Sequence, residues 1–375
     1  YRQSQFDRVS QAQRQAGSAF KPVVYAAAFA EGVATPATLL ADSPIVVQVS
    51  GRPWAPQNND HDYRGWVTAR TALEQSLNVP TVRLALAVGL EKIVSLAHDM
   101  GIAGHLEPMP ALALGAFGVT PRELATVYGT LASGGTRPDV HGLSAIVSAA
   151  GERLEGPSLP EPQRVLQAQP AYLVTSLLEG VLDHGTAAGA RRQGVTDELA
   201  GKTGTTNGRR DNWFAGYSPN RVTVVWVGYD DDGKSHLSGS SAALPIWSRF
   251  TRAVRPATGY PGFTPPPGIV TATVDPTTGQ LATAACPTTV TDLFPEWKAP
   301  LEPCQAHSAG SSVPFQTASL GEGQSLAPLP AGPSGPAGEV QRPGTILIRR
   351  SAPPAEEAEE DWSVLSGTPS PPPPS

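Results

Sequence analysis

The chain has 375 residues, of which 40% are hydrophobic and 16% charged, so it has enough apolar material for a large globular domain and is not a fully disordered protein. Its 27 lysine and arginine residues face 33 acidic ones, giving a net charge of −6, and no basic run is present that would follow a phosphate backbone, so no nucleic-acid partner is expected. The longest apolar run, eight residues from Val23 to Ala30, is far shorter than the roughly 20 that a membrane-spanning helix needs.

The first half of the chain has helical patterns. An alanine-rich stretch from Ala19 to Gly32 predicts a helix with Ser18 at its entry, where Pro22 in the first turn costs little because the missing amide would have no helical partner. Three more segments are typical of helices, and the first of them is expected to break near Pro80: Arg70–Ala87, Glu123–Ala132 and Ala171–Leu182.

The character changes after residue 198. Three segments are rich in β-branched and aromatic residues and are separated by turn residues: Leu199–Thr203, Asn212–Tyr217 and Val222–Tyr229. The segment Pro245–Val254 is typical of a closing helix. Helices, then antiparallel strands, then a helix predict an α/β (α+β) fold in which helices flank an antiparallel sheet.

Beyond Pro256 the regular patterns weaken. We expect a main domain over residues 1–256 and a small β-like extension over residues 257–306, with strand-like sequence from Ile269 to Val290. Residues 307–375 are rich in Pro, Gly, Ser and Glu and are expected to be disordered, because such a segment cannot bury enough apolar surface to offset its ordering entropy. Cys286 and Cys304 lie about 18 residues apart, which allows either one disulfide or two free thiols.

Three short motifs could carry chemistry, in this order along the chain: Ser18-Ala19-Phe20-Lys21, Ser76-Leu77-Asn78 and Lys202-Thr203-Gly204-Thr205-Thr206. Each alone has an ordinary explanation, since the first two occur by chance in chains of this size and the third is also a plain turn after a strand. Together, in this order and on these predicted elements, they indicate a functional site.

The chemistry of these residues supports a nucleophilic site. Positions i and i+3 share one face of a helix, so Ser18 Oγ and Lys21 Nζ are expected within hydrogen-bond distance. A serine becomes a good nucleophile when a neighbour takes its proton, and a lysine does so only if burial or another cation lowers its pKa. Lys202 would supply that second positive charge.

The other motif residues are expected to handle the substrate. Ser76 would pass a proton between Lys21 and a leaving amine, and Asn78 would hold Lys21 or a substrate amide. Gly204 would let a substrate strand lie close to the sheet edge. The remaining roles involve the third motif: Lys202 and Thr205 would hold a substrate carboxylate beside Thr203, and the backbone amides of Ser18 and Thr205 would form the oxyanion hole.

These motifs resemble those of the active-serine transpeptidases that penicillin inhibits. The flanking strings "RQAGSAFKPVVYAAA", "WAPQNND", "ALEQSLNVPTVRLA", "GKTGTTNGRRDNWFAGYSP" and "VWVGYDDD" look like the transpeptidase domain of a class A, bifunctional penicillin-binding protein. The resemblance covers about Arg14 to Arg252, with Ala16 where the family commonly has proline.

The resemblance implies a D,D-transpeptidase that cross-links peptidoglycan stem peptides through a Ser18 acyl-enzyme, is acylated by β-lactams and needs no cofactor or metal. It also implies an extracytoplasmic location and a cell-wall synthesis complex as partner. Members of the family have a membrane anchor and a glycosyltransferase domain upstream, and the first strands of their sheet would precede Tyr1. We therefore interpret the chain as a fragment. In an oxidising compartment a Cys286–Cys304 disulfide is favoured over free thiols.

Two rival interpretations remain. A serine β-lactamase uses similar motifs, but Leu77 stands where the class A enzymes have aspartate, and no glutamate string for water activation is evident. A non-catalytic penicillin-binding sensor or scaffold is disfavoured because all the motif residues are present. The segment Asp60–Asp62, with one histidine between two aspartates, is expected to be a solvated loop. Asp211 and Trp213 are expected to have no catalytic role, because an ordinary hairpin explains them.

Overall fold

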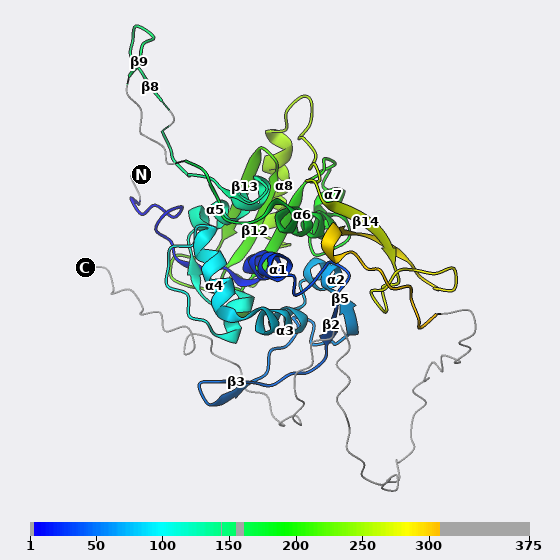
Figure 1. Cartoon of the computed structure of the whole chain (residues 1–375). Helices are drawn as coiled ribbons and strands as arrows, with labels where there is room; N and C mark the ends of the chain where they lie inside the picture. Colours follow the sequence, from blue (N-terminus) through cyan, green and yellow to red (C-terminus); the bar gives the residue numbers. More distant parts are fainter. Residues whose placement is uncertain (1–3, 144, 155–160, 308–375) are drawn as a thin grey trace, which may run out of the picture.

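The computed structural model describes residues 4–143, 145–154 and 161–307 (Figure 1). The expected disordered tail therefore lies, except for its first residue, outside the described residues. The described part has a mixed α/β fold with antiparallel sheets flanked by helices. In that part, no helix is both long enough and apolar enough to cross a membrane.

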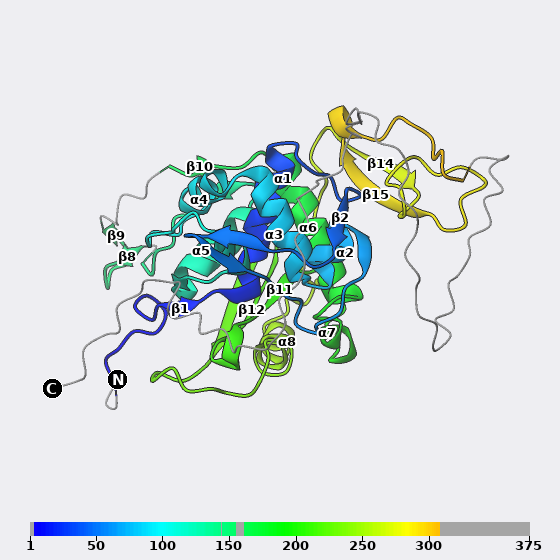
Figure 2. The same ribbon diagram turned by 90° about the horizontal axis from the view of Figure 1, so that it is seen from below.

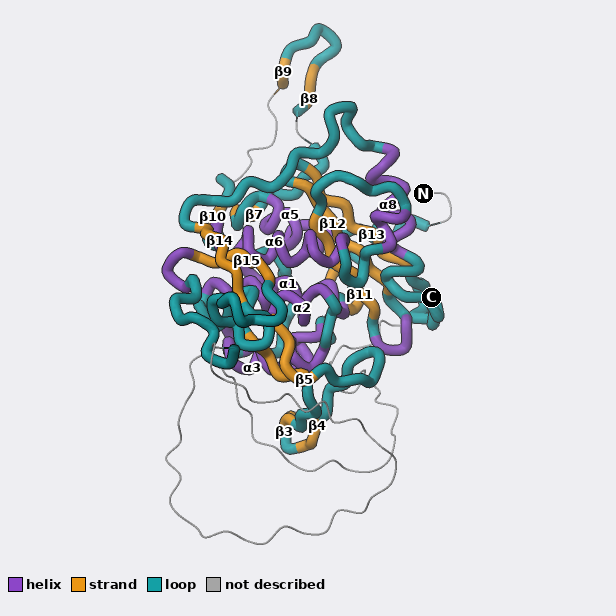
Figure 3. The backbone as a smooth tube through the Cα atoms, turned by 90° about the vertical axis from the view of Figure 1, so that its right-hand side faces the viewer, coloured by secondary structure: helices purple, strands orange, loops and turns teal. Residues whose placement is uncertain are grey.

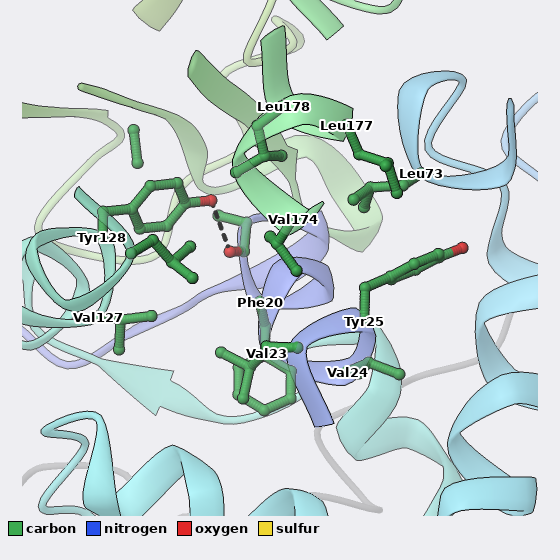
Figure 4. Close-up of a cluster of buried hydrophobic side chains, with 14 of the residues drawn as sticks. Phe20, Val23, Val24, Tyr25, Leu73, Val127, Tyr128, Val174, Leu177 and Leu178 are labelled. Atoms are coloured by element: carbon green, nitrogen blue, oxygen red, sulfur yellow. Dashed lines mark hydrogen bonds between the residues drawn. The ribbon is translucent and has the colours of Figure 1, made fainter. Parts of the chain in front are cut away.

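The helix α1 (Lys21–Ala30) lies at the centre of the main body and follows directly on a 3-10 turn, η1 (Gly17–Phe20). Nine of its ten residues are buried, which the alanine-rich sequence permits because small side chains let neighbouring helices approach closely from every side. Its neighbours in the core come from α2 (Ala69–Glu74), α5 (Pro121–Ala132) and α6 (Ala168–Asp183), as Figure 4 shows. The expected helices at Ala19–Gly32, Glu123–Ala132 and Ala171–Leu182 are thus confirmed within a few residues.

The main sheet has three antiparallel strands in the order β11 (Ala200–Thr205), β12 (Asn212–Ser218) and β13 (Arg221–Val227), close to the predicted segments. In Figure 2, β12 lies between α8 (Ala243–Ala253) on one side and α1, α5 and α6 on the other. The period of two along β12 explains this: Phe214 packs on Trp247 of α8, whereas Tyr217 points the other way and its hydroxyl contacts Thr175 of α6.

The break in the second predicted helical segment is not at Pro80. The structure has α2 ending at Glu74 and α3 beginning at Asn78 (Asn78–Val88), with Gln75–Leu77 between them. Pro80 lies in the first turn of α3, where its missing amide has no helical partner, so it favours a helix start. The predicted position of the break was therefore wrong. The true position is relevant to the site, because Ser76 lies in the segment between the two helices.

The sequence analysis also missed many short elements. The helices α4 (Leu90–Asp99) and α7 (Gly189–Arg192) and the 3-10 turns η2 (Pro110–Leu114), η3 (Asn207–Arg209) and η4 (Glu296–Lys298) complete the helical part. Apart from the pair in the extension, the described residues form five two-stranded pairs: β1 (Arg14–Gln15) with β6 (Gly118–Val119), β2 (Leu39–Asp42) with β5 (Gly65–Thr68), β3 (Val47–Val49) with β4 (Arg52–Trp54), β7 (Thr136–Arg137) with β10 (Gln163–Arg164), and β8 (Ile146–Val147) with β9 (Arg153–Leu154).

The extension forms a hairpin-like module, β14 (Ile269–Val274) paired with β15 (Val290–Pro295), at one side of the main body (Figure 3). Its own buried apolar cluster is small and consists of Val274 and Phe294 with Ala37 from the main body. Polar contacts attach it to the rest: Arg70 of α2 binds Asp292 at 2.5 Å, and Lys298 Nζ donates to the carbonyl of Gly32.

Candidate active site

Ser18 lies in η1, and η1 lies directly on β11. Ser18 is 9% exposed and has buried neighbours on both sides. The approach depends on Gly17, which has a φ of +53° and whose position leaves no room for a side chain, since a Cβ there would be 2.8 Å from the Thr205 carbonyl oxygen. From the other side, the buried Tyr128 hydroxyl donates a hydrogen bond of 2.9 Å to the Ala19 carbonyl, the dashed line in Figure 4. The turn that carries Ser18 is therefore positioned by β11 on one side and by the Tyr128 hydroxyl of α5 on the other.

Lys21 is fully buried and its ammonium points at the segment between α2 and α3. Nζ donates to the Ser76 carbonyl at 2.7 Å, to Asn78 Oδ1 at 2.6 Å and to the Leu77 carbonyl at 3.2 Å, and Ser76 Oγ lies 3.4 Å away. The structure thus joins the first two motifs through one side chain. A charged ammonium can donate to three of these oxygens, whereas a neutral amine can donate to only two.

The expected direct hydrogen bond between Ser18 and Lys21 is absent among the described residues. Ser18 belongs to the 3-10 turn and Lys21 is the first residue of α1, and since i and i+3 share a face in such a turn as well, the spacing does not explain the missing bond. Lys21 is engaged by the second motif instead. Catalytic hydrogen bonds are often long or misaligned before substrate binds, so this geometry does not remove Lys21 as a base.

Lys202 brings the third motif to the same place. Its fully buried ammonium donates to Ser76 Oγ at 2.8 Å, so Ser76 lies between two lysines. Burial, and secondarily the positive charge of Lys202, lower the pKa of Lys21 well below its usual value. Burial lowers the pKa of Lys202 to about 7. Ser76 itself has a φ of +57°, a conformation that non-glycine residues rarely adopt and that is concentrated at functional sites.

Asn78 is held in position by Asn58, a residue that the sequence analysis did not identify. The buried Asn58 accepts hydrogen bonds from the backbone N–H of Asn78 at 2.8 Å and of Val79 at 3.2 Å, and so caps the start of α3. Asn58 in turn donates to Asp42, a fully buried carboxylate, at 2.7 Å. Only the string "WAPQNND" pointed to this loop, and no local pattern shows that Asn58 reaches a helix 20 residues away.

The face of β11 determines what its residues can do. Lys202 and Gly204 point toward the Ser18 turn, and the alternation along a strand sends Thr203 and Thr205 to the other side. A Cβ at Gly204 would lie 3.0 Å from both the Ala16 carbonyl oxygen and Ala19 Cβ. The glycine is therefore needed by the turn that carries Ser18, whereas the sequence analysis assigned it to contact with a substrate strand.

The side chains of Thr203 and Thr205 form hydrogen bonds on the face of β11 opposite Lys202. The Thr203 hydroxyl lies 2.9 Å from that of Thr186, and Thr205 Oγ1 accepts from the backbone N–H of Gly239 at 2.9 Å. A hydroxyl that accepts one hydrogen bond keeps its own proton for donation, so Thr205 can still bind an anion.

The outer edge of β11 presents unpaired backbone donors. Thr206 N–H donates to the Asp211 carbonyl at 3.1 Å, which places this pair in the hydrogen-bonded register with β12. Because hydrogen-bonded and non-bonded pairs alternate in an antiparallel ladder, the N–H groups of Thr205 and Thr203 point away from β12. The edge beside Ser18 thus offers amide donors to a ligand.

The predicted disulfide is not formed, since both cysteines are free thiols in the structure. Instead, Cys286 and Cys304 lie in a group with Asp275 and His307 whose ligand atoms are all within 4.8 Å of one another. The expectation of no metal-binding arrangement missed this group because its members are spread over 33 positions; only the spacing Cys304-x-x-His307 hints at it. The segment Asp60–Asp62 is exposed, and Asp60 pairs with Arg64.

Trp213 and Asp211 have structural contacts. The Trp213 indole N–H donates to the Gln15 carbonyl at 2.8 Å, and Asp211 accepts from the Trp226 indole at 2.9 Å. The first contact attaches the segment before Ser18 to the sheet, and the second joins β13 to the residue that precedes β12.

Comparison with known proteins gives two family matches. Residues 1–251 match the penicillin-binding protein transpeptidase domain, and residues 265–309 match the C-terminal domain of penicillin-binding protein 1A. Similar proteins include penicillin-binding protein 1B of Vibrio cholerae, 37% identical over 66% of this chain and 32% of the relative, and penicillin-binding protein 1A of Aquifex aeolicus, 39% identical over 76% and 39%. The chain thus spans about a third of the length of these relatives.

Solved structures agree with these matches. Penicillin-binding protein 1A from Haemophilus influenzae has a TM-score of 0.75 with 27% identity and covers 81% of this chain and 51% of its own. The PonA1 protein from Mycobacterium tuberculosis in complex with penicillin V has a TM-score of 0.59 with 26% identity, over 70% and 73% of the two chains.

Proposed function

The chain belongs to the penicillin-binding protein transpeptidase family, and from that premise we propose that it is a serine-type D,D-transpeptidase with Ser18 as the nucleophile. Its donor substrate would be a peptidoglycan stem peptide ending in D-Ala-D-Ala, and β-lactams would acylate the same serine. The observation that carries the proposal is the buried line of hydrogen bonds Lys21–Ser76–Lys202 beside the Ser18 turn.

The first step is acylation. Neutral Lys21 takes the proton of Ser18 Oγ as that oxygen attacks the carbonyl carbon of the penultimate D-Ala. The lowered pKa of Lys21 raises the fraction of neutral amine above that of an ordinary exposed lysine. The tetrahedral oxyanion is held by the N–H groups of Ser18 and Thr205, and each such donor is typically worth about 3 kcal/mol of barrier.

Ser76 completes the proton path. The amine of the leaving D-Ala needs a proton when the peptide bond breaks, and the Ser76 hydroxyl, 3.4 Å from Lys21 and 2.8 Å from Lys202, can give its own proton and regain one from either lysine. The second step is the reverse: an amine on a neighbouring stem peptide attacks the acyl-enzyme and loses its proton along the same path.

The substrate would bind as an added strand. The unpaired N–H groups of Thr203 and Thr205 on the outer edge of β11 suit an extended peptide, and Asn78 would hold a substrate amide beside Lys21. The Thr205 hydroxyl would hold the substrate carboxylate at the strand edge, and Lys202, on the opposite face of β11, would contribute its positive charge. No cofactor takes part in these steps. We further propose that the chain acts on the extracytoplasmic face of the bacterial membrane, where its substrate lies, within cell-wall synthesis.

Intact-mass spectrometry after brief exposure to benzylpenicillin tests the proposal. Wild type is expected to gain one penicilloyl group that persists for hours, and Ser18→Ala is expected to gain none. Ser95→Ala, which removes an exposed hydroxyl on α4, is the matched control and should be labelled like wild type.

Three outcomes contradict the proposal. Labelling of Ser18→Ala would assign the nucleophile elsewhere. An adduct on wild type that vanishes within seconds while penicillin is consumed would indicate a β-lactamase. No adduct on a folded wild-type chain would mean that the site does not acylate.

A further inference from the structure

Four side chains of metal-ligating type meet in the C-terminal module, outside the active site. Asp275 follows β14, Cys286 comes from the loop before β15, and Cys304 and His307 come from the segment after η4. We propose that Asp275, Cys286, Cys304 and His307 bind one zinc ion that holds the module together.

The distances fit a tetrahedral site. Cys304 Sγ lies 3.5 Å from Asp275 Oδ2 and 3.6 Å from His307 Nδ1. In a tetrahedron with zinc–sulfur bonds of about 2.3 Å and zinc–nitrogen or zinc–oxygen bonds of about 2.0 Å, these edges are about 3.5 Å. Asp275 Oδ2 and His307 Nδ1 are 2.5 Å apart, shorter than the edge of about 3.3 Å, so these two would move apart by less than 1 Å.

The surroundings of the cluster orient its ligands. Asp275 Oδ1 accepts from the backbone and side chain of Thr277, at 2.8 Å and 2.6 Å, which leaves Oδ2 facing the cluster. Cys286 Sγ accepts from the backbone N–H of Thr283 at 3.3 Å, and Cys304 Sγ accepts from the Thr278 hydroxyl at 3.7 Å. Such outer contacts to carboxylate and sulfur are typical of metal sites, where they fix the direction of each ligand.

The ligand types select zinc. Two thiolates, one imidazole and one carboxylate in a tetrahedral arrangement suit Zn²⁺, and four protein ligands make a closed, structural site. Binding is not a redox step: Zn²⁺ replaces the protons of two thiols, two protons are released to solvent, and the imidazole binds in its neutral form. A disulfide would use the two sulfurs and leave Asp275, which is 1% exposed, and His307 with only their pairing to each other.

The module also needs such a crosslink. Its apolar cluster has only two buried residues of its own, Val274 and Phe294, and folding units of about 40 residues usually depend on a disulfide, a metal or a partner. A zinc bound by Asp275, Cys286 and Cys304 would join the turn after β14, the long loop before β15 and the C-terminal segment. His307, which the sequence analysis assigned to the tail, would be the last ligand of the module.

Metal analysis of the purified full chain tests the proposal. After incubation with ZnSO₄ and removal of unbound metal, wild type is expected to hold about one zinc per chain. Cys304→Ala and His307→Ala are expected to hold at least tenfold less, and His105→Ala, which removes an exposed histidine elsewhere, is expected to hold as much as wild type. Co²⁺ in place of zinc should give thiolate-to-metal charge-transfer absorption in wild type and not in Cys304→Ala.

Thiol titration of the denatured chain decides against the rival state. Two free thiols per chain support the zinc site, whereas a chain that is 2 Da lighter, has no reactive thiols and takes up no zinc contains a disulfide and overturns the proposal. Zinc binding that persists in both ligand variants would reflect surface histidines only and also overturns it. Penicillin labelling of Ser18 in the same samples is expected to be unchanged, so failure here is distinct from failure of the transpeptidase proposal.

Discussion

Two features of its surroundings affect Lys21. Burial and the neighbouring charge of Lys202 lower its pKa, and oxygen atoms of the second motif hold its nitrogen in place. In the proposed mechanism the first makes Lys21 a base, and the second directs its nitrogen to the Ser76 segment. A single lysine therefore connects the nucleophile's helix to the proton path, and its loss should affect chemistry more than folding.

Lys21→Ala is expected to slow acylation by benzylpenicillin by about 100- to 10,000-fold, the range typical for loss of a general base. The thermal unfolding midpoint should change little, because the lost hydrogen bonds of the amine are offset by the removal of a polar group that was costly to bury. Stopped-flow or quenched-flow mass spectrometry measures the rate, with the exposed Lys92→Met as control. Acylation within threefold of wild type would move the base role to another residue.

Lys202 makes stability depend on pH. Its pKa is lowered from 10.5 to about 7 by burial, so between these values the unfolded chain binds more protons than the folded chain. The free energy of unfolding must then rise with pH across this window, by at most about 1.4 kcal/mol per pH unit for one group.

Lys202→Met removes this titration. We expect the free energy of unfolding of the variant, relative to that of wild type, to be highest at pH 6 and to decrease progressively toward pH 10. The reason is that only wild type loses a buried positive charge as pH rises. Thermal unfolding of both chains from pH 6 to pH 10 measures the difference. Lys234→Met, at an exposed position, should follow wild type throughout. A difference that does not vary with pH would contradict the buried, pKa-shifted lysine.

At the scale of elements, the active site is the contact between one turn and one strand. The η1 turn lies on β11 because both contribute glycine at the contact: Gly17 faces the Thr205 carbonyl, and Gly204 faces the Ala16 carbonyl and the Ala19 side chain. The distance between Ser18 and the amide donors of β11 therefore depends on having glycine, with no side chain, at positions 17 and 204.

Gly204→Ala is expected to slow acylation more than tenfold and to cost about 1–3 kcal/mol of stability, since the new methyl group would push η1 off β11. Gly142→Ala is the matched control, because a Cβ there meets nothing within 4 Å. Acylation kinetics and thermal unfolding measure the two effects. A Gly204→Ala chain that acylates at the wild-type rate would show that the turn and the strand need not touch.

The sequence predicted the elements that carry long, regular patterns and missed those that depend on distant contacts. The strands β11, β12 and β13 were found within a few residues because β-branched and aromatic runs end in turn residues. The break at Gln75–Leu77 was missed because proline was taken as a breaker, although at Pro80 it begins a helix. Two-residue strands such as β1 have no period to detect.

The candidate site divides in the same way. The motif residues were found because their chemistry is written in short strings, and the structure brings Lys21, Ser76 and Lys202 together. Asn58 was missed because it acts on Asn78, 20 positions away, and the group around Asp275 was missed because its members are spread over 33 positions. Their signal is tertiary proximity, which residue spacing does not contain.

At the scale of the whole molecule, the C-terminal module and the active site share α2. Arg70, in the first turn of α2, binds Asp292 of β15 with two hydrogen bonds and also Glu74 and the Ser176 carbonyl of α6. The helix ends two residues before Ser76. The ion pair is nearly buried, with side-chain exposures of 18% for Arg70 and 3% for Asp292. The negative charge of Asp292 is therefore needed to offset the cost of burying the positive charge of Arg70.

Asp292→Asn is expected to lower the free energy of unfolding by up to about 3 kcal/mol, because it removes the nearer of the two carboxylates, Asp292 and Glu74, that pair with a largely buried guanidinium. It should also separate the module from the main body, so that limited proteolysis cuts within residues 265–307 faster than in wild type. Asp183→Asn is the matched control: it breaks the Arg191–Asp183 pair, whose carboxylate is 51% exposed, and such a pair is worth about 1 kcal/mol or less. Equal shifts of the unfolding midpoint for both variants, with unchanged proteolysis, would mean that the module does not depend on Arg70 and that α2 is anchored by its apolar contacts alone.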